Sequence, residues 1–181
     1  MKKRLLILGV ITLAMLMQSG CTHVDGGATI KKVGKQARFV ILPMENLAET
    51  PRANERVESM LQSLMHSKGI RNLAAAPKAT GEEVDLALLL DDGKRLETAK
   101  DWALKKGFRY GITGSIQEWR YKTGLDGEPA VGITLKLIDL ENKDALLWTA
   151  TASRTGWGSE NLTGTTADVL KTLISKMEFL P

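Results

Sequence analysis

The residue types that carry out catalysis or bind metals are scarce in this chain. The sequence holds one cysteine, Cys21, and two histidines, His23 and His66, which stand apart from one another and from any serine that they could activate. Adjacent carboxylates such as Asp91 and Asp92 could act as general acids, but surface pairs of this kind are more often solvated turn residues. We therefore expect a protein that is not an enzyme and that needs no metal or cofactor.

Cys21 directly follows a leader that is typical of exported proteins. Residues 1–20 begin with three basic residues, continue with an apolar run too short to span a bilayer, and end in small residues. This layout resembles a bacterial lipoprotein signal peptide, in which the thiol of the cysteine is diacylated and becomes the new N-terminus. Gln18 departs from the aliphatic residue usual at that position, so an ordinary cleaved signal with Cys21 as a free thiol is the alternative.

Lipidation of Cys21 would remove a thiol that has no disulfide partner in an oxidising compartment. Several acyl chains, each contributing roughly 0.8 kcal/mol per buried methylene, make a permanent anchor. Thr22 stands where an aspartate would mark retention at the inner membrane, so the resemblance to lipoproteins implies the outer membrane.

The mature chain is nearly neutral. Three of the 25 basic residues of the full sequence lie in the leader, so the mature chain has 22 basic and 21 acidic residues. Net charge therefore indicates no nucleic-acid partner. The remaining length of about 160 residues suits one domain with a hydrophobic core.

We expect three parts along the chain: the signal peptide over 1–20, a lipidated cysteine with a flexible tether over 21–36, and a single periplasmic domain over 37–181. The tether region shows no apolar period. The nearly unbroken apolar run at 38–42 predicts a strand covered on both faces, which requires helices on two sides of a sheet.

Helical periodicity predicts a helix over 53–67 closed by Gly69, a second around 96–103, and a last over 162–177. A short strand is expected at 70–73, and 82–90 is ambiguous between helix and buried strand. Alternating residues predict three antiparallel strands near 110–121, 131–137 and 146–152. The fold class is therefore α/β, an α+β sandwich, in which helices flank both faces of a mixed sheet that ends in an antiparallel meander.

Two details of the meander concern tryptophans. The apolar phase of the first strand slips after Ile116, which predicts a bulge or an overhanging strand end and puts Trp119 and Tyr121 on the face opposite to Ile112. In the third strand Leu146, Trp148 and the alanines that follow are expected to share the core face.

The segment between the first two meander strands is unusually specific. Residues 114–132 read GSIQEWRYKTGLDGEPAVG, preceded by FVILP at 39–43 and ENL at 45–47 and followed by LW at 147–148 and TGW at 155–157. These segments resemble PelC, the family of outer-membrane lipoproteins of Pel exopolysaccharide export, over essentially the whole mature chain. The family is similar in fold to the periplasmic domain of curli-secretion lipoproteins.

This resemblance implies a homo-oligomeric ring, a dodecamer if like PelC, beneath an outer-membrane β-barrel exporter. The ring would guide a cationic exopolysaccharide, Pel, to the barrel during formation of the biofilm matrix. Guidance of a polycation needs an acidic surface, because clefts of one charge concentrate the opposite charge. Asp126 and Glu128 are the expected acidic residues, since they lie in the most specific segment; the alternative is that they only form the turn. The other carboxylates available are Glu82, Glu83, Asp85, Asp91 and Asp92.

Four further residues are candidates for surface roles. Trp157, between two glycines, matches the aromatic residue that the family is thought to place in the membrane, and a packed core position is its alternative. Trp119 and Tyr121 could stack on sugars or, as we expect, contribute to a subunit interface. Arg95 could line the ring.

A different class of protein remains open, a monomeric periplasmic lipoprotein adaptor that activates an envelope enzyme. Activators that cross the peptidoglycan need a long, proline-rich arm. The segment 21–36 is short and has no proline. The short arm therefore favours the ring-forming lipoprotein over the adaptor.

Overall fold

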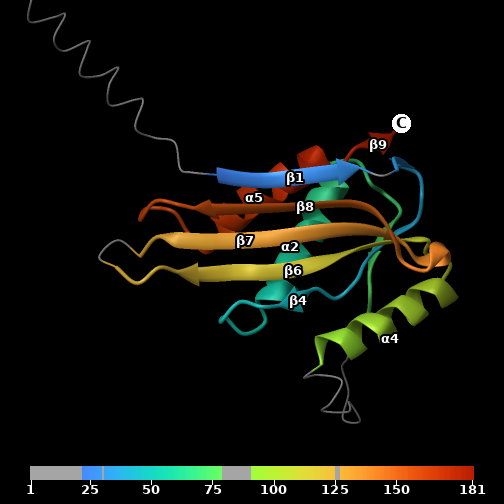
Figure 1. The fold of residues 1–181 in the computed structure, drawn as a ribbon, viewed down its shortest axis with the longest axis horizontal. Coiled ribbons are helices and arrows are strands. Elements are labelled where there is room, and N and C mark those ends of the chain that lie inside the picture. Colours follow the sequence, from blue (N-terminus) through green and yellow to red (C-terminus); the bar gives the residue numbers. More distant parts are fainter. Residues whose placement is uncertain (1–21, 30, 79–90, 125–126) are drawn as a thin grey trace, which may run out of the picture.

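One mixed β-sheet forms the frame of the protein (Figure 1). The computed structural model describes residues 22–29, 31–78, 91–124 and 127–181. The strands of the main sheet follow the order β1-β8-β7-β6-β3-β5, with β4 paired to β6. Their bounds are β1 Thr22–Thr29, β3 Phe39–Ile41, β4 Glu45–Asn46, β5 Leu73–Ala75, β6 Tyr110–Tyr121, β7 Pro129–Asp139 and β8 Ala145–Thr155. A second, small sheet pairs β2 (Val33–Gly34) with β9 (Phe179–Leu180).

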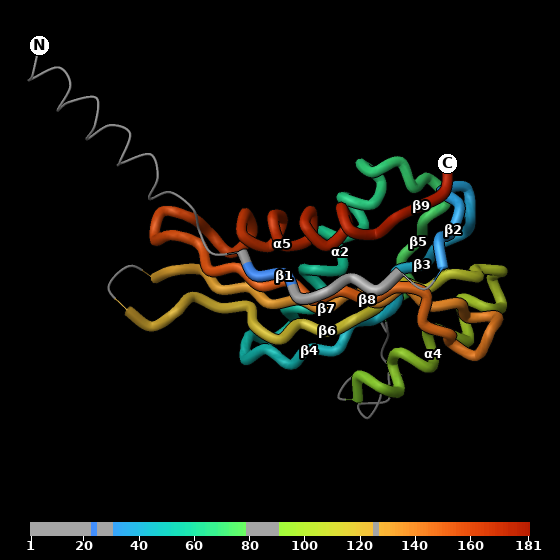
Figure 2. Tube along the Cα trace, turned by 45° about the horizontal axis from the view of Figure 1, so that its top comes forward, coloured from blue at the N-terminus to red at the C-terminus, as the bar shows by residue number. Residues whose placement is uncertain are grey.

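Helices cover the sheet from two sides, as the sequence predicts. Helices α2 (Ala53–Ser67) and α5 (Leu162–Lys176) lie against one face, and α4 (Asp92–Lys105) lies on the other (Figure 2). Strands β6, β7 and β8 form the predicted antiparallel meander, whereas β3 runs parallel to both β5 and β6. A short 3-10 helix, η1 (Leu140–Asn142), joins β7 to β8. The α/β fold class with a mixed sheet is confirmed.

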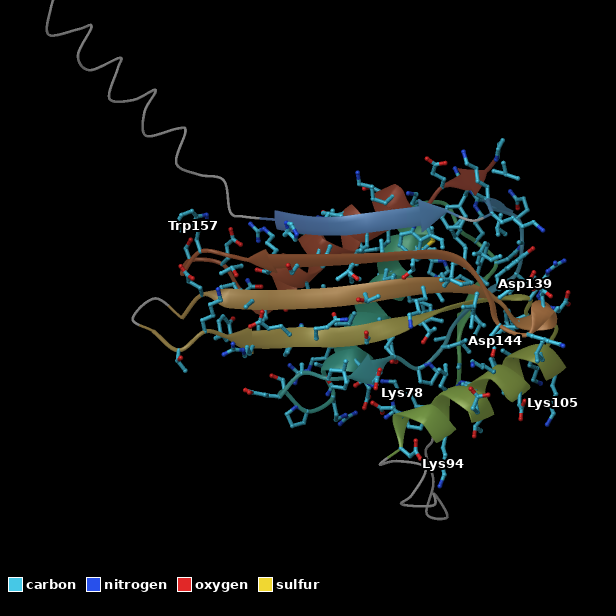
Figure 3. All side chains as sticks on the ribbon, in the orientation of Figure 1. Lys78, Lys94, Lys105, Asp139, Asp144 and Trp157 are labelled. Atoms are coloured by element: carbon cyan, nitrogen blue, oxygen red, sulfur yellow. The ribbon has the colours of Figure 1, made fainter. Side chains whose placement is uncertain are left out.

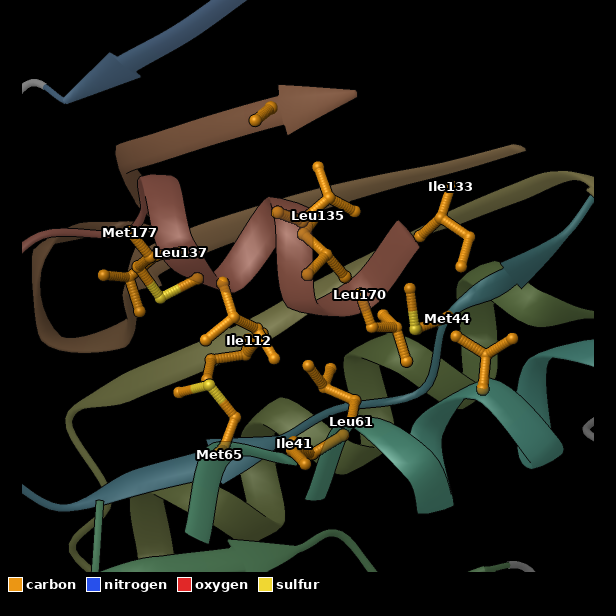
Figure 4. Close-up of a cluster of buried hydrophobic side chains, with 14 of the residues drawn as sticks. Ile41, Met44, Leu61, Met65, Ile112, Ile133, Leu135, Leu137, Leu170 and Met177 are labelled. Atoms are coloured by element: carbon orange, nitrogen blue, oxygen red, sulfur yellow. The ribbon is translucent and has the colours of Figure 1, made fainter. Parts of the chain in front are cut away.

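Strand β3 contributes to both cores, which explains its unbroken apolar sequence. Phe39 and Ile41 lie in the large core under α2 and α5, part of which is shown in Figure 4. Val40 and Leu42 lie in the smaller core with residues of α4 such as Ala103. Side chains that alternate across a strand must both be apolar when both faces are covered.

The helix ends follow local sequence rules. Gly69 closes α2 with a φ of +92°, a left-handed conformation that glycine adopts without strain. The side chains of Asp91 and Asn161 cap α4 and α5 by accepting hydrogen bonds from Lys94 N and Gly164 N. The predicted strand at 70–73 is wrong in position: Ile70 is buried in the turn, and β5 begins only at Leu73. The ambiguous segment 82–90 lies outside the described residues.

The predicted flexible tether is wrong for residues 22–29, which form β1. This strand pairs with β8 in an antiparallel register that places Thr22 opposite Arg154 and Thr29 opposite Trp148. The open edge of β8 offers unpaired backbone groups, and β1 satisfies them without needing apolar side chains. A bulge between Asp25 and Gly27 leaves no regular alternation in β1, which explains why its sequence reads as a linker.

The meander contains the predicted bulge, with a different result. The register between β6 and β7 shifts between Ile116 and Glu118. This shift returns Trp119 to the core face that carries Ile112, so the prediction of opposite faces is wrong for Trp119. A second shift, in the β7–β8 ladder, buries Leu147 and leaves Leu146 exposed, although Trp148 is in the core as expected.

Candidate functional site

Three segments that are distant in sequence meet at one end of the sheet. The start of β1, the β6–β7 hairpin and the turn between β8 and α5 lie together at the left of Figure 1. Thr22 pairs with Arg154 near the end of β8, and Gly156 N donates a hydrogen bond of 2.8 Å to Pro129 O at the base of the hairpin. Figure 3 shows Trp157 at this end and Asp139 at the opposite one.

The turn that carries Trp157 presents this side chain to the outside. Trp157 is 47% exposed, and its carbonyl oxygen accepts a hydrogen bond of 2.8 Å from Glu160 N, which closes the turn. Arg154, on the strand before the turn, makes a bidentate contact with Glu160, with Nη2 to Oε1 at 3.0 Å. This arginine holds the pKa of Glu160 below its ordinary value. The two ends of the turn are therefore joined by an ion pair as well as by backbone bonds.

Gly156 is required for this turn to pack against the hairpin. A Cβ atom at this position would lie 2.4 Å from Glu160 Oε2 and 2.9 Å from Pro129 Cγ. Such distances are too short for any side chain. The glycine before Trp157 therefore allows the turn to pack closely against the hairpin.

The hairpin between β6 and β7 brings Glu128 to the same end. Lys122 N donates a hydrogen bond of 2.8 Å to Glu128 O, which closes the hairpin, and the Glu128 side chain is half-buried. Asp126 lies outside the described residues. Tyr121 is 48% exposed, and its hydroxyl oxygen accepts a hydrogen bond of 3.3 Å from Leu162 N at the start of α5. The predicted surface residues Tyr121, Glu128 and Trp157 are thus brought together.

Trp119 does not belong to this surface. Its indole is only 6% exposed, Nε1 donates a hydrogen bond of 2.9 Å to Thr166 Oγ1, and the guanidinium of Arg56 lies over the ring at 5.1 Å from its centroid. The roles predicted for Trp119, stacking on sugars or contributing to a subunit interface, do not fit this burial. Trp119 fixes the N-terminal turn of α5 to β6.

Arg95 lies away from the Trp157 end, in a groove between α2, α4 and β5. Its Nη2 contacts Asp92 Oδ1 at 3.2 Å, and Asp92 Oδ2 accepts a hydrogen bond of 2.9 Å from Asn46 N. Because Asp91 caps α4 and Asp92 is bound on both oxygens, these two acids hold α4 in place. Glu82, Glu83 and Asp85 lie outside the described residues, as does Cys21.

The same groove contains a carboxyl that sequence reasoning missed. Glu58 Oε1 accepts a hydrogen bond of 2.8 Å from Met44 N, and burial raises the pKa of Glu58 to about 7 against the opposing effects of this bond and of Arg95. Glu58 follows Val57 and stands three residues before Leu61, at the edge of the stripe that α2 turns to the core. A carboxylate beside an apolar stripe is the signal that could have revealed it.

The described part of the chain has neither a metal-binding cluster nor a membrane-spanning helix. No cluster of three or more histidine, cysteine, aspartate or glutamate side chains there could hold a metal ion. None of the helices described is both long enough and apolar enough to cross a membrane.

Solved structures of a lipoprotein and of PelC have folds similar to that of this chain. The lipoprotein GNA1162 from Neisseria meningitidis has a similar structure, with a TM-score of 0.51 and 14% identity over 77% of this chain and 96% of that one, a likeness of fold alone. The PelC dodecamer from Paraburkholderia phytofirmans is more similar, with a TM-score of 0.70 and 29% identity over 90% of this chain and 100% of that one. A single-residue variant of that PelC, also a dodecamer, gives a TM-score of 0.71 at the same identity and coverage.

The resemblance to PelC that residues 114–132 and their flanking segments predict is thereby confirmed. No protein-family model matches the chain, and a search of curated proteins gave no match. The similarity to PelC is therefore established through structure.

Proposed function

We propose that this protein is a non-catalytic lipoprotein of the outer membrane that assembles into a ring on the periplasmic side and guides a cationic exopolysaccharide, Pel, to a β-barrel exporter. Cys21 carries the lipid, and the ring holds twelve copies if it follows the PelC structures. The observation that carries this proposal is the structural similarity to the PelC dodecamer, with 29% identity over 90% of this chain. A second observation is the pairing of Thr22 with Arg154, which lies three residues before the exposed Trp157.

This pairing supports one orientation of the domain relative to the membrane. The residue after the lipidated cysteine is the first of β1, so little free chain separates the anchor from the sheet. The end of the sheet with Trp157 then faces the lipid headgroups, where an indole satisfies both its apolar ring and its N–H group.

The β6–β7 hairpin lies at this same end, and Glu128 with it. Asp126 is the second acidic residue of this segment of the sequence. In the ring these acids stand repeated around the opening that faces the exporter. Repeated carboxylates concentrate a polycation at the opening and so guide the polymer into the barrel. Lys122 and Arg120 lie nearby, but Arg120 is paired to Glu118 at 3.0 Å.

The first experiment is the mass in solution of the chain from Thr22 onward, by light scattering after size exclusion. We expect one large species, unchanged by Trp157→Ala because that residue contacts the membrane and not a neighbour. A monomer at high protein concentration would contradict the ring as a property of the domain and would favour the adaptor that activates an envelope enzyme.

The second experiment tests guidance. Asp126→Asn together with Glu128→Gln should reduce export of the polymer and leave the mass of the ring unchanged. Glu97→Gln, at an exposed position of α4, is the matched control. Full export by the double variant would show that the hairpin acids only form the turn.

A further inference from the structure

The groove between α2, α4 and β5 is large enough to hold a small molecule. Its volume is about 370 Å³, within the range of ligand sites in proteins. The floor is apolar and is formed by residues such as Ile41, Pro43, Ala76 and Ala99. The groove lies at the carboxyl ends of β3 and β5, where it is lined by α2 from one side and by α4 from the other, and it shares no residue with the Trp157 end described above.

A single carboxylate oxygen of Glu58 is available to this groove. Met44 is clamped by two side chains of α2, since its N–H donates to Glu58 Oε1 at 2.8 Å and its carbonyl oxygen accepts from Asn54 Nδ2 at 3.0 Å. This clamp fixes Glu58 Oε1 and leaves Oε2 as the free acceptor. One free oxygen suits a point-like ammonium group better than a guanidinium, which prefers to contact both oxygens of a carboxylate.

The other charged groups around the groove already have partners. Glu55 is bound by Arg52 Nε at 2.7 Å and by Lys78 Nζ at 2.8 Å, which lowers the pKa of Glu55 to about 2. Arg95 is paired with Asp92 at 3.2 Å. Among the described carboxylates that line the groove, Glu58 has no cation in ion-pair contact. Burial raises its pKa to about 7 because the more distant Arg95 and Lys78 offset only part of the cost of desolvation. Charge complementarity therefore calls for a cation at Glu58.

Neutral hydrogen-bonding side chains complete the lining. Ser59 and Gln62 of α2 and Thr98 of α4 face the groove together with its apolar floor. A ligand that uses all three features carries an ammonium group, several hydroxyls and an apolar face. We propose that the groove binds one amino-sugar unit, with its ammonium on Glu58 Oε2, its hydroxyls on Ser59, Gln62 and Thr98, and its apolar face on the floor.

This site would be a second contact for the polymer. The choice of an amino sugar as the ligand rests partly on the proposed function. The probe is galactosamine, with N-acetylgalactosamine as the neutral match and Nα-acetyl-lysine as an ammonium without a sugar. The protein is the mature chain in detergent micelles, labelled at the alanine and isoleucine methyl groups, which remain observable by NMR in large assemblies.

We expect galactosamine to shift the methyl signals of Ile41, Ala76 and Ala99 with a dissociation constant on the order of millimolar near neutral pH, because one sugar unit buries little surface. N-acetylgalactosamine should shift them at least tenfold less. Glu58→Gln should abolish the response to galactosamine, whereas Glu97→Gln on the exposed side of α4 should retain it.

Three results would overturn the proposal. The first is an equal response to the neutral sugar or in Glu58→Gln. The second is an equal response to Nα-acetyl-lysine, which would assign the groove to a protein partner. The third is a shift of the same signals with protein concentration alone, which would assign it to a second copy of the chain. Because none of these readouts depends on export or on the ring, failure here leaves the proposed function standing, and failure of the ring leaves this site standing.

Discussion

Arg154 and Glu160 close the turn that presents Trp157, through a bidentate ion pair in which the arginine side chain is only 13% exposed. Arg154 is also the residue opposite Thr22 in the β1–β8 ladder. One side chain thus lies between strand β1 and the turn that carries the exposed indole. The position of Trp157 depends on this ion pair and on the packing of Gly156.

Glu160→Gln should destabilise the fold by about 1–2 kcal/mol, because Arg154 would lose a charged partner in a mostly buried place. The pKa of Glu160 is lowered in the folded protein. The contribution of Glu160 to the stability of the fold is therefore fully present above the ordinary carboxyl pKa. It is lost as the pH falls through the lower pKa that Glu160 has in the folded protein. Urea unfolding at several pH values measures this. Glu178→Gln, which breaks an exposed pair with Lys32, is the control and should change the stability less than Glu160→Gln does, because solvent screens the pair.

Trp157→Ala should weaken binding of the protein to vesicles and leave its stability unchanged within about 0.5 kcal/mol, since the indole is 47% exposed. Flotation with vesicles of phosphatidylethanolamine and phosphatidylglycerol, using the chain from Thr22 onward, measures the first effect. Leu104→Ala removes an exposed apolar side chain of α4 and should leave binding unchanged. Equal binding by Trp157→Ala and the unchanged protein would refute the membrane role.

Glu58→Gln should stabilise the protein at pH 8 by about 1–3 kcal/mol and have little effect at pH 4. The folded pKa of about 7 lies above the ordinary 4.5, so the unchanged protein loses stability as pH rises from 4.5 through 7 while the glutamine variant does not. The amide oxygen still accepts from Met44 N. Urea midpoints at the two pH values test this. A constant difference between the proteins at both pH values would show that Glu58 is not titrating in this window.

Trp119→Phe should destabilise the fold by about 1–3 kcal/mol, because it removes the hydrogen bond to Thr166 and part of a buried ring. Light scattering should show an unchanged mass, since the indole is inside the subunit. Tyr121→Phe is the matched aromatic change at an exposed position and should cost less than about 1 kcal/mol. A change of mass in Trp119→Phe would restore the interface role that burial argues against.

Much of the fold is predictable from local pattern. The helix at 53–67 and the meander appear where the apolar periods place them, and the bulge after Ile116 appears where the phase slips. Apolar periodicity does not predict a strand that is held by backbone pairing and not by burial of its side chains. Strand β1, with a bulge between Asp25 and Gly27, is held by the edge of β8 and has no apolar signature.

The sequence by itself determined that the chain resembles PelC, that residues 21–181 are nearly neutral, and that helices cover both faces of a mixed sheet. These are properties of composition and short-range spacing. Only the tertiary structure decided that Trp119 is core, that Arg95 belongs to a groove with Glu58, and that Thr22, Glu128 and Trp157 share one end of the sheet. Such relations depend on strand register and on contacts between distant residues, which local periodicity does not encode.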